Sequence, residues 1–270
     1  MSIVIRASSP APQSTAFSRV TRQRDLMTHL VGREFRLRYR RSALGWLWSI
    51  AQPLARLLIL SFIFTQVIPL NIDNYPVFLY SGLVVWVLFS SGVNAAASSV
   101  LDRSDLLLRP GLPRSILPVI SVIGDSVDYL LALPVLLTFV VVGGIGLTPA
   151  LVYLPILLVA EFLLVLGIGF ALSPLQVRYR DVSRFIDVVM LLGFYATPVF
   201  YDPEEIPDGF RWLVDWNPMA HILRAHRSVI LDGQWPGTPT VLGLLALGLG
   251  STAAGLAIYR RSSPGFIDEL

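Results

Sequence analysis

The chain has 270 residues, of which 54% are hydrophobic and 14% are charged, and its mean hydropathy is +0.66. Soluble domains carry about 25% charged residues, so this composition indicates a polytopic membrane protein. The sequence contains no lysine, no cysteine and three histidines, which excludes a P-loop lysine, a Schiff-base lysine, a thiolate nucleophile and a cysteine-ligated metal. This leaves little material for enzyme chemistry or for a metal site. We expect no metal or cofactor in this chain and no nucleic-acid partner.

The first forty residues are polar and rich in arginine. Residues 1–21 show no apolar periodicity and are predicted to form a flexible tail. At 22–41, apolar residues recur at helical spacing among arginines, which predicts an amphipathic helix lying on the membrane surface; packing on a soluble neighbour is the alternative. No apolar stretch of signal-peptide length precedes the first span, so we expect no cleaved signal. Four arginines should anchor this region to lipid phosphates, namely Arg36, Arg38, Arg40 and Arg41.

Six apolar segments follow, each close to the length that a hydrocarbon core of about 30 Å requires. An even number of spans places both termini on one side, and 17 of the 21 arginines fall on that side, which the positive-inside rule assigns to the cytoplasm. We predict an all-α domain of six transmembrane helices over residues 42–260, followed by a cytoplasmic tail at 261–270. The predicted spans are 49–69, 76–100, 117–142, 151–172, 185–199 and 240–259.

The loop at 101–116 combines acidic residues, three leucines, an arginine and a Pro/Gly stop. This pattern predicts a helix of one or two turns. A short helix with an apolar tip on a cytoplasmic loop favours docking into a groove of a partner, and folding back onto the membrane surface is an equal alternative. The residues concerned are Asp102, Arg103, Asp105, Leu106, Leu107, Leu108 and Arg109.

The external segment at 200–238 carries two helix-start signals. Asp202-Pro203 and Asn217-Pro218 each combine a capping residue with a proline, and Gly233 supplies a stop. We predict two short re-entrant helices that return towards the bilayer, with an amphipathic lid resting on lipid as the alternative. Their aromatic rings suit either the membrane interface or sugar rings: Phe200, Tyr201, Trp212 and Trp216.

Four ionisable residues fall inside the predicted spans: Arg56, Asp125, Asp128 and Glu161. A central aspartate costs about 2.5 to 3.5 kcal/mol on insertion scales, so these groups need partners or water. Carboxylates in this position can form a proton relay. We favour pairing with Arg56, or exposure to a polar conduit, because one arginine and several carboxylates are available together.

Five motifs resemble landmarks of the ABC-2 type permease subunits that export polysaccharides, O-antigens and teichoic acids. Their order and spacing match that family over about residues 20–260. The motifs are Tyr39-Arg40-Arg41-Ser42 with Leu44-Gly45-Trp46-Leu47-Trp48 and Pro53, Arg109-Pro110 to Pro118, Arg178-Tyr179-Arg180-Asp181, Thr197-Pro198-Val199-Phe200-Tyr201, and Trp216-Asn217-Pro218.

The resemblance implies a homodimer of permease chains that works with two separate ATP-binding subunits, which would carry ATP and Mg²⁺. It implies export of a lipid-linked polysaccharide or teichoic-acid-like polymer across a bacterial plasma membrane, with residues 102–110 as the coupling helix. Aromatic rings would line the conduit, because sugar faces stack on them weakly enough to slide. These conduit residues would be Trp46, Trp48, Phe194, Tyr195, Phe200, Tyr201, Trp212 and Trp216.

Three other functions remain open at the level of sequence. One is a drug or antibiotic efflux permease of the same superfamily. Another is a membrane-embedded glycosyl- or acyltransferase that uses Asp125, Asp128 or Glu161. The third is a proton-coupled carrier that uses the same carboxylates.

Overall fold

The computed structural model describes residue 32 and residues 45–107 and 112–266. The predicted tail at 1–21 and nearly all of the predicted interface helix at 22–41 lie outside these ranges. The same is true of the predicted lipid anchors and of three residues of the predicted coupling helix. These residues are Arg36, Arg38, Arg40, Arg41, Leu108, Arg109 and Pro110, and their roles stay predictions.

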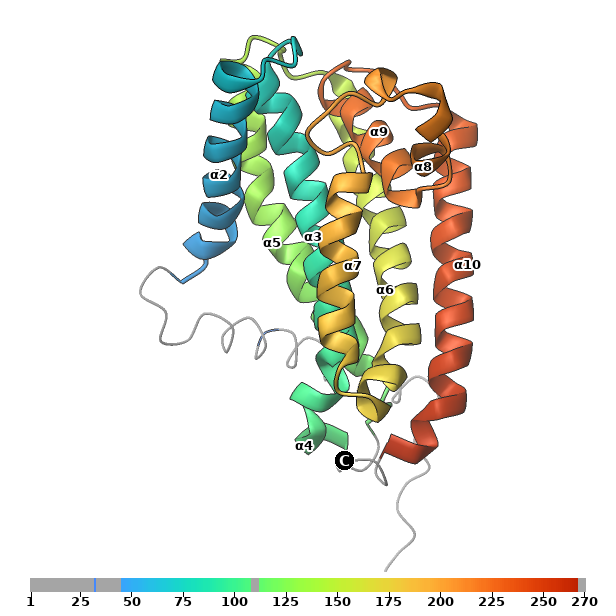
Figure 1. Cartoon of the computed structure of the whole chain (residues 1–270). Coiled ribbons are helices and arrows are strands. Elements are labelled where there is room, and N and C mark those ends of the chain that lie inside the picture. The colour runs from blue at the N-terminus through green and yellow to red at the C-terminus, as the bar shows by residue number, and fades with distance from the viewer. Residues whose placement is uncertain (1–31, 33–44, 108–111, 267–270) are drawn as a thin grey trace, which may run out of the picture.

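All regular elements in the described part of the chain are helical, which confirms the all-α prediction. Six long helices run up and down in one bundle (Figure 1). They are α2 (Leu47–Phe62), α3 (Tyr75–Asp102), α5 (Ile116–Val142), α6 (Leu154–Arg178), α7 (Val182–Ala196) and α10 (Thr238–Ser262).

Short helical elements join these six. They are η1 (Ile63–Val67), α4 (Ser104–Leu107), η2 (Pro149–Tyr153), η3 (Pro203–Glu205), η4 (Asp208–Phe210), α8 (Trp212–Asp215), α9 (Pro218–Ile230) and η5 (Ser263–Gly265). The predicted loop helix is present as α4, and the external helix predicted to start at Asn217-Pro218 is present as α9. The other predicted external helix is broken into η3, η4 and α8.

Five of the predicted spans are helices long and apolar enough to cross a membrane. With their short extensions they run over Leu47–Val67, Tyr75–Asp102, Ile116–Val142, Pro149–Arg178 and Thr238–Gly265. The remaining one, α7, has 15 residues and a length of about 22 Å, which is less than a hydrocarbon core of about 30 Å.

Our prediction that the fifth span continues as a helix to residue 199 is wrong. The helix ends at Ala196, and Thr197 has extended dihedrals of φ −100° and ψ 137°. The cause is Pro198, because a proline disfavours helical dihedrals in the residue before it. The chain therefore turns inside the region that we had assigned to the bilayer.

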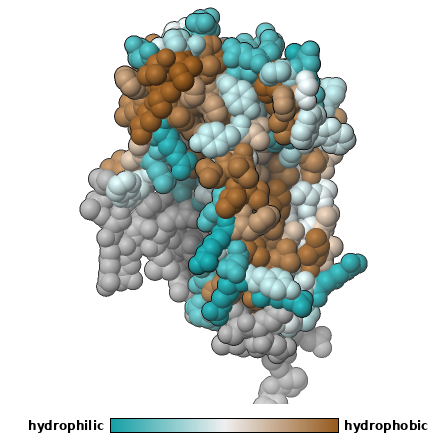
Figure 2. Space-filling model, viewed as in Figure 1, coloured by the Kyte–Doolittle hydropathy of each residue, from teal (hydrophilic) through white to brown (hydrophobic). Residues whose placement is uncertain are grey.

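Helix α3 is the centre of the bundle. In its most apolar stretch 78% of the residues are buried, whereas the corresponding value for α2 is 11%. Helices α2 and α7 lie at the periphery and expose large apolar side chains, including Leu58 and Phe62 on α2 and Phe185 and Leu192 on α7. Figure 2 shows this apolar surface over α2 and α7 and hydrophilic residues gathered at the end near α9.

Helices α6 and α10 touch at their backbones. A Cβ atom at Gly255 of α10 would overlap the carbonyl oxygen of Gly167 in α6. Next to this contact, Thr252 Oγ1 donates a hydrogen bond of 2.6 Å to the Leu163 carbonyl oxygen. Small residues allow this close approach, which is a common source of helix association in membranes. We therefore regard α6 and α10 as one rigid pair.

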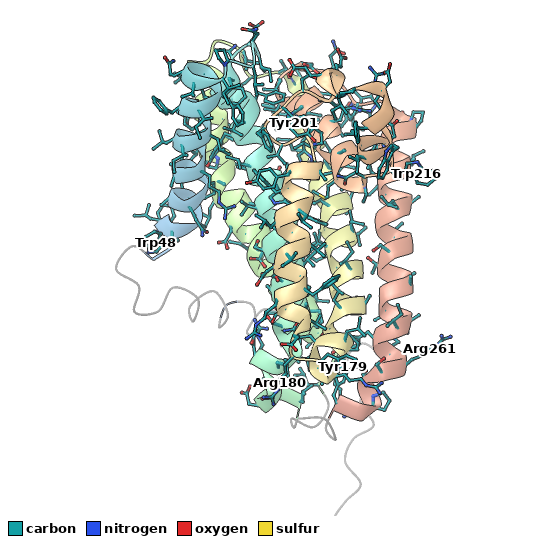
Figure 3. The ribbon with its side chains drawn as sticks, viewed as in Figure 1. Trp48, Tyr179, Arg180, Tyr201, Trp216 and Arg261 are labelled. Carbon is teal, nitrogen blue, oxygen red and sulfur yellow. The ribbon has the colours of Figure 1, made fainter. Side chains whose placement is uncertain are left out.

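The bundle has two chemically different ends. Figure 1 places α4 and the C-terminal ends of α6 and α10 at one end, and α8 and α9 at the other. Figure 3 shows Arg180 and Arg261 at the α4 end. The loops and helix termini at that end carry Arg103, Arg114, Arg178, Arg180, Arg184, Arg260 and Arg261.

We predict that Gly255→Leu destabilises the fold by about 3 kcal/mol, because the added side chain has no space against α6. The change should lower the thermal unfolding midpoint of the purified protein in detergent, followed by tryptophan fluorescence. Gly243→Leu is the matched control on the same helix, since a Cβ atom there meets nothing within 4 Å. Equal midpoints for the two variants would contradict the close contact.

Candidate functional site

The predicted coupling helix begins later than expected. Asp102 is the last residue of α3, where it accepts a hydrogen bond of 2.7 Å from Ser98 Oγ. The helical dihedrals break at Arg103, and α4 follows. The Arg103 guanidinium donates to Ser121 Oγ of α5 at 3.0 Å, so the base of α4 is fixed to the bundle.

Our prediction of an exposed leucine tip on this helix is wrong for the two leucines that the structure describes. Leu106 and Leu107 are 4% and 9% exposed and belong to the chain's own hydrophobic core. The bend at Arg103 turns them inwards, because an exposed apolar pair gains free energy by leaving water. The accessible face of the segment is polar and consists of Asp102, Ser104 and Asp105.

Four of the predicted conduit rings meet between the α7 end and the turn that follows it. Phe200 is the hub, with its ring centroid 5.5 Å from that of Phe194, 5.9 Å from Tyr195 and 5.0 Å from Tyr201. Phe64 of η1 stacks on the other side of Phe200 at 5.5 Å. We call these five residues the aromatic cluster. Tyr195 is 60% exposed, so the cluster reaches the surface of the chain.

The other four predicted conduit rings lie elsewhere. Trp46 and Trp48 stand at the start of α2, at the opposite end of that helix from η1, and Trp212 and Trp216 are at α8. Figure 3 shows Trp48, Tyr201 and Trp216 well apart. A single chain therefore does not gather all eight rings on one surface. The aromatic cluster also contains Phe64, which the sequence analysis missed.

The turn at 197–201 is tied to the bundle by Arg227 of α9. Its Nη1 donates to the Pro198 carbonyl oxygen at 2.7 Å, and its Nη2 donates to the Val199 carbonyl oxygen at 2.7 Å and to that of Phe78 at 3.4 Å. The guanidinium carbon lies 3.5 Å from the centre of the Phe78 ring. Broken backbone at membrane depth needs donors of this kind, because lipid supplies none.

Three other residues also hold the turn at 197–201 in place. Tyr75 of α3 donates to the Phe200 carbonyl oxygen at 2.9 Å, and Asn217 Nδ2 donates to Thr197 Oγ1 at 2.8 Å. Gly82 of α3 makes the contact sterically possible, since a Cβ atom there would lie 2.7 Å from the Val199 carbonyl oxygen. The backbone that carries the aromatic cluster is therefore held from α3 and α9 together.

The sequence analysis gave Arg227 no such role. A signal existed, because Arg227 follows Met219 and Leu223 at intervals of four residues, and both are buried. An arginine in line with an apolar helix face is either a boundary residue or a buried donor. The sequence does not decide between these two possibilities, because the answer depends on where the turn at 197–201 packs against α3.

The predicted pairing of Arg56 with intramembrane carboxylates does not occur within the described part of the chain. Arg56 is exposed on α2, and the ion pairs among the described residues do not include it. Asp125 and Asp128 instead border a cavity of about 260 Å³ between α2, α3 and α5, together with Gln52 and Ser91. Apolar side chains such as Val84, Leu88 and Ala132 line much of this cavity, so the alternative of a polar conduit stays a prediction.

Glu161 has a partner that the sequence analysis missed. His226 of α9 is fully buried, as is Glu161, and His226 Nε2 lies 4.0 Å from Glu161 Oε2. His226 Nδ1 donates to the Ile222 carbonyl oxygen at 2.9 Å, so its Nε2 is an acceptor when the ring is neutral. At this separation the two groups make no hydrogen bond, and His226 Nε2 and both carboxylate oxygens of Glu161 have no hydrogen-bond partner among the described residues.

Comparison with known proteins gives related sequences along nearly the whole chain. A family model described as ABC-2 type transporter matches residues 26–231. The O-antigen export system permease protein RfbA of Klebsiella pneumoniae is 31% identical over 249 residues, covering 91% of this chain and 95% of the relative. RfbA of Myxococcus xanthus is 29% identical, covering 92% and 96%. The polysialic acid transport protein KpsM of Escherichia coli is 25% identical, covering 84% and 90%.

We predict that Arg227→Met destabilises the protein, because two buried carbonyl groups lose their donors at a cost of about 1 to 3 kcal/mol each. The thermal unfolding midpoint in detergent should fall, and Arg227→Lys should restore only part of the loss, because an ammonium lacks the planar fork. Arg224→Met is the control, one turn away and exposed. A midpoint unchanged by Arg227→Met would show that the hydrogen bonds of Arg227 contribute nothing to the stability of the protein.

Proposed function

Because the chain belongs to the ABC-2 type transporter family, we propose that it is the permease subunit of an ATP-driven exporter of a lipid-linked polysaccharide. The observation that carries this proposal is the similarity to O-antigen export permeases over 91% of the chain. The lack of lysine excludes a P-loop in this chain, so ATP and Mg²⁺ would be bound by a separate subunit.

The α4 end faces the cytoplasm in this proposal. The seven arginines of the α4 end, against three near α9, support that orientation through the positive-inside rule. Helix α7 and the turn at 197–201 together would form the sixth crossing, with the broken backbone buried in protein rather than exposed to lipid. Both termini would then lie in the cytoplasm of a bacterial cell, and the chain would reside in the plasma membrane.

Two copies of the chain would enclose the conduit. The exposed apolar faces of α2 and α7 offer the surface for a second copy, and Tyr195 of the aromatic cluster is exposed beside them. Phe194, Phe200 and Tyr201 would continue this ring surface towards the α9 end. Trp46 and Trp48 would stand at the cytoplasmic side, and Trp212 and Trp216 are suited to anchor α8 at the outer interface.

The segment around α4 would transmit the action of the ATPase. Its exposed face, formed by Asp102, Ser104 and Asp105, is suited to polar contacts with a partner. Leu106, Leu107 and Arg103 join it rigidly to the bundle. A displacement of this segment would therefore be passed to α3 and α5 rather than absorbed by a flexible loop.

The function is tested by deleting the gene in a strain that makes the polymer. We expect polymer to accumulate inside the cells and to disappear from the surface, and expression of the chain with its ATP-binding partner should restore it. An inactive ATPase partner should fail to do so. Export by the purified chain in liposomes without any ATPase would contradict the proposal.

We predict that Asp105→Arg weakens association with the ATP-binding subunit by about tenfold, since one reversed charge at a polar contact changes the binding free energy by about 1.4 kcal/mol. Copurification of the two subunits and the amount of surface polymer should both fall. Asp181→Arg is the control, because Asp181 is an exposed aspartate in the other loop at the same end. Equal losses for both variants would argue against α4 as the coupling element.

A further inference from the structure

A large cavity opens at the α9 end of the bundle, outside the aromatic cluster. Its volume is about 1130 Å³, and it lies between the loop before α3, the loop after α5 and the segment from Pro198 to Asp232. Pockets for single drug-sized ligands measure about 300 to 1,000 Å³. This cavity is therefore large enough for a ligand of several sugar rings.

The cavity is lined by groups that accept and donate hydrogen bonds. Carboxylates accept hydrogen bonds, whereas guanidinium groups and the amide of Asn74 donate them. The lining can therefore bind a hydroxyl group either as a donor or as an acceptor. Partial burial raises the pKa of Asp232 above the ordinary aspartate value. The charged lining residues are Asp73, Asp202, Glu204, Asp215, Asp232, Arg211, Arg224 and Arg227.

A buried charged residue, Arg227, forms part of the cavity wall. It lines the cavity, it is only 8% exposed, and its Nε has no hydrogen-bond partner among the described residues. A buried donor without a partner costs free energy. Because Nε itself is closed off from the cavity, a ligand that accepts a hydrogen bond from it would have to displace the neighbouring atoms, and the new hydrogen bond would offset that displacement. Pro198 and Asp202 connect the cavity to the turn that carries the aromatic cluster.

We propose that the cavity binds an uncharged, hydroxyl-rich segment of the polymer as it leaves the conduit, an inference that rests on the proposed export function. The site has four carboxylates and three guanidinium groups even if Asp232 is neutral, so a polyanionic chain is repelled overall. A metal ion is not a suitable occupant, because the described residues contain no group of three His, Cys, Asp or Glu side chains placed to hold one.

The absence of cysteine from the chain allows a direct test with single cysteines in intact cells. Glu204→Cys places a thiol in the cavity lining, and Glu205→Cys places one on the next residue, which is exposed but does not line the cavity. Both are labelled with a membrane-impermeant maleimide, in cells that make the polymer and in cells whose first glycosyltransferase is deleted. Surface polymer is measured in the same cultures.

We expect polymer synthesis to slow the labelling of Glu204→Cys several-fold and to leave that of Glu205→Cys unchanged. Equal labelling of Glu204→Cys in both strains, while export proceeds normally, would overturn the site and leave the proposed function intact. Surface polymer that does not depend on the chain would instead refute the proposed function.

The charge of the bound segment is tested with the purified Glu204→Cys protein in nanodiscs. Maltohexaose and a sialic acid oligomer of equal length serve as neutral and anionic probes. We expect only maltohexaose to slow the maleimide reaction. Protection by neither probe, or stronger protection by the sialic acid oligomer, would overturn the assignment to an uncharged segment.

Discussion

The arrangement depends on how the chain satisfies the backbone that leaves the helical pattern after α7. Pro198 ends α7 and leaves the carbonyl groups of the following turn without helical partners. Arg227 donates to two of them and also reaches the Phe78 carbonyl oxygen of α3. Desolvating a guanidinium is costly, and the three carbonyl contacts and the Phe78 ring offset that cost. These hydrogen bonds of Arg227 fix α9 against α3 and hold the turn that carries Phe200 and Tyr201. Arg227 also lines the cavity at the α9 end.

Other contacts divide the bundle into a fixed and an adaptable part. Backbone contact at Gly167 and Gly255 joins α6 to α10, and the hydrogen bond from Thr252 to the Leu163 carbonyl oxygen reinforces it. On the other side, α2 and α7 expose apolar faces, and the aromatic cluster lies on η1, the end of α7 and the turn at 197–201. A transporter needs rigid elements that transmit force and a surface that can open. The distribution of contacts in this chain is consistent with both requirements.

Much of the fold was predictable because membrane insertion imposes strong local rules. The apolar spans at 76–100 and 117–142 correspond closely to α3 and α5, and the predicted caps are confirmed, since Asp202 and Asn217 each accept a backbone hydrogen bond. The site was less predictable. The contacts of Arg227 with Pro198, and of Phe64 with Phe200, join residues distant in sequence. Leu106 also points inwards, although Ser104 and Asp105 directly before it are exposed, because the chain bends at Arg103. Spacing along the chain carries no information about such contacts.

The central claim is that polymer passes between two copies of this chain along the exposed part of the aromatic cluster. Cross-linking of Tyr195→Cys in otherwise unchanged protein tests it most directly, because the sequence has no other thiol and Tyr195 is exposed on α7. We expect oxidation to join two copies through this position and to stop export, and a reductant to restore it. Cross-linked dimers that export polymer at the rate of the reduced protein would contradict the account.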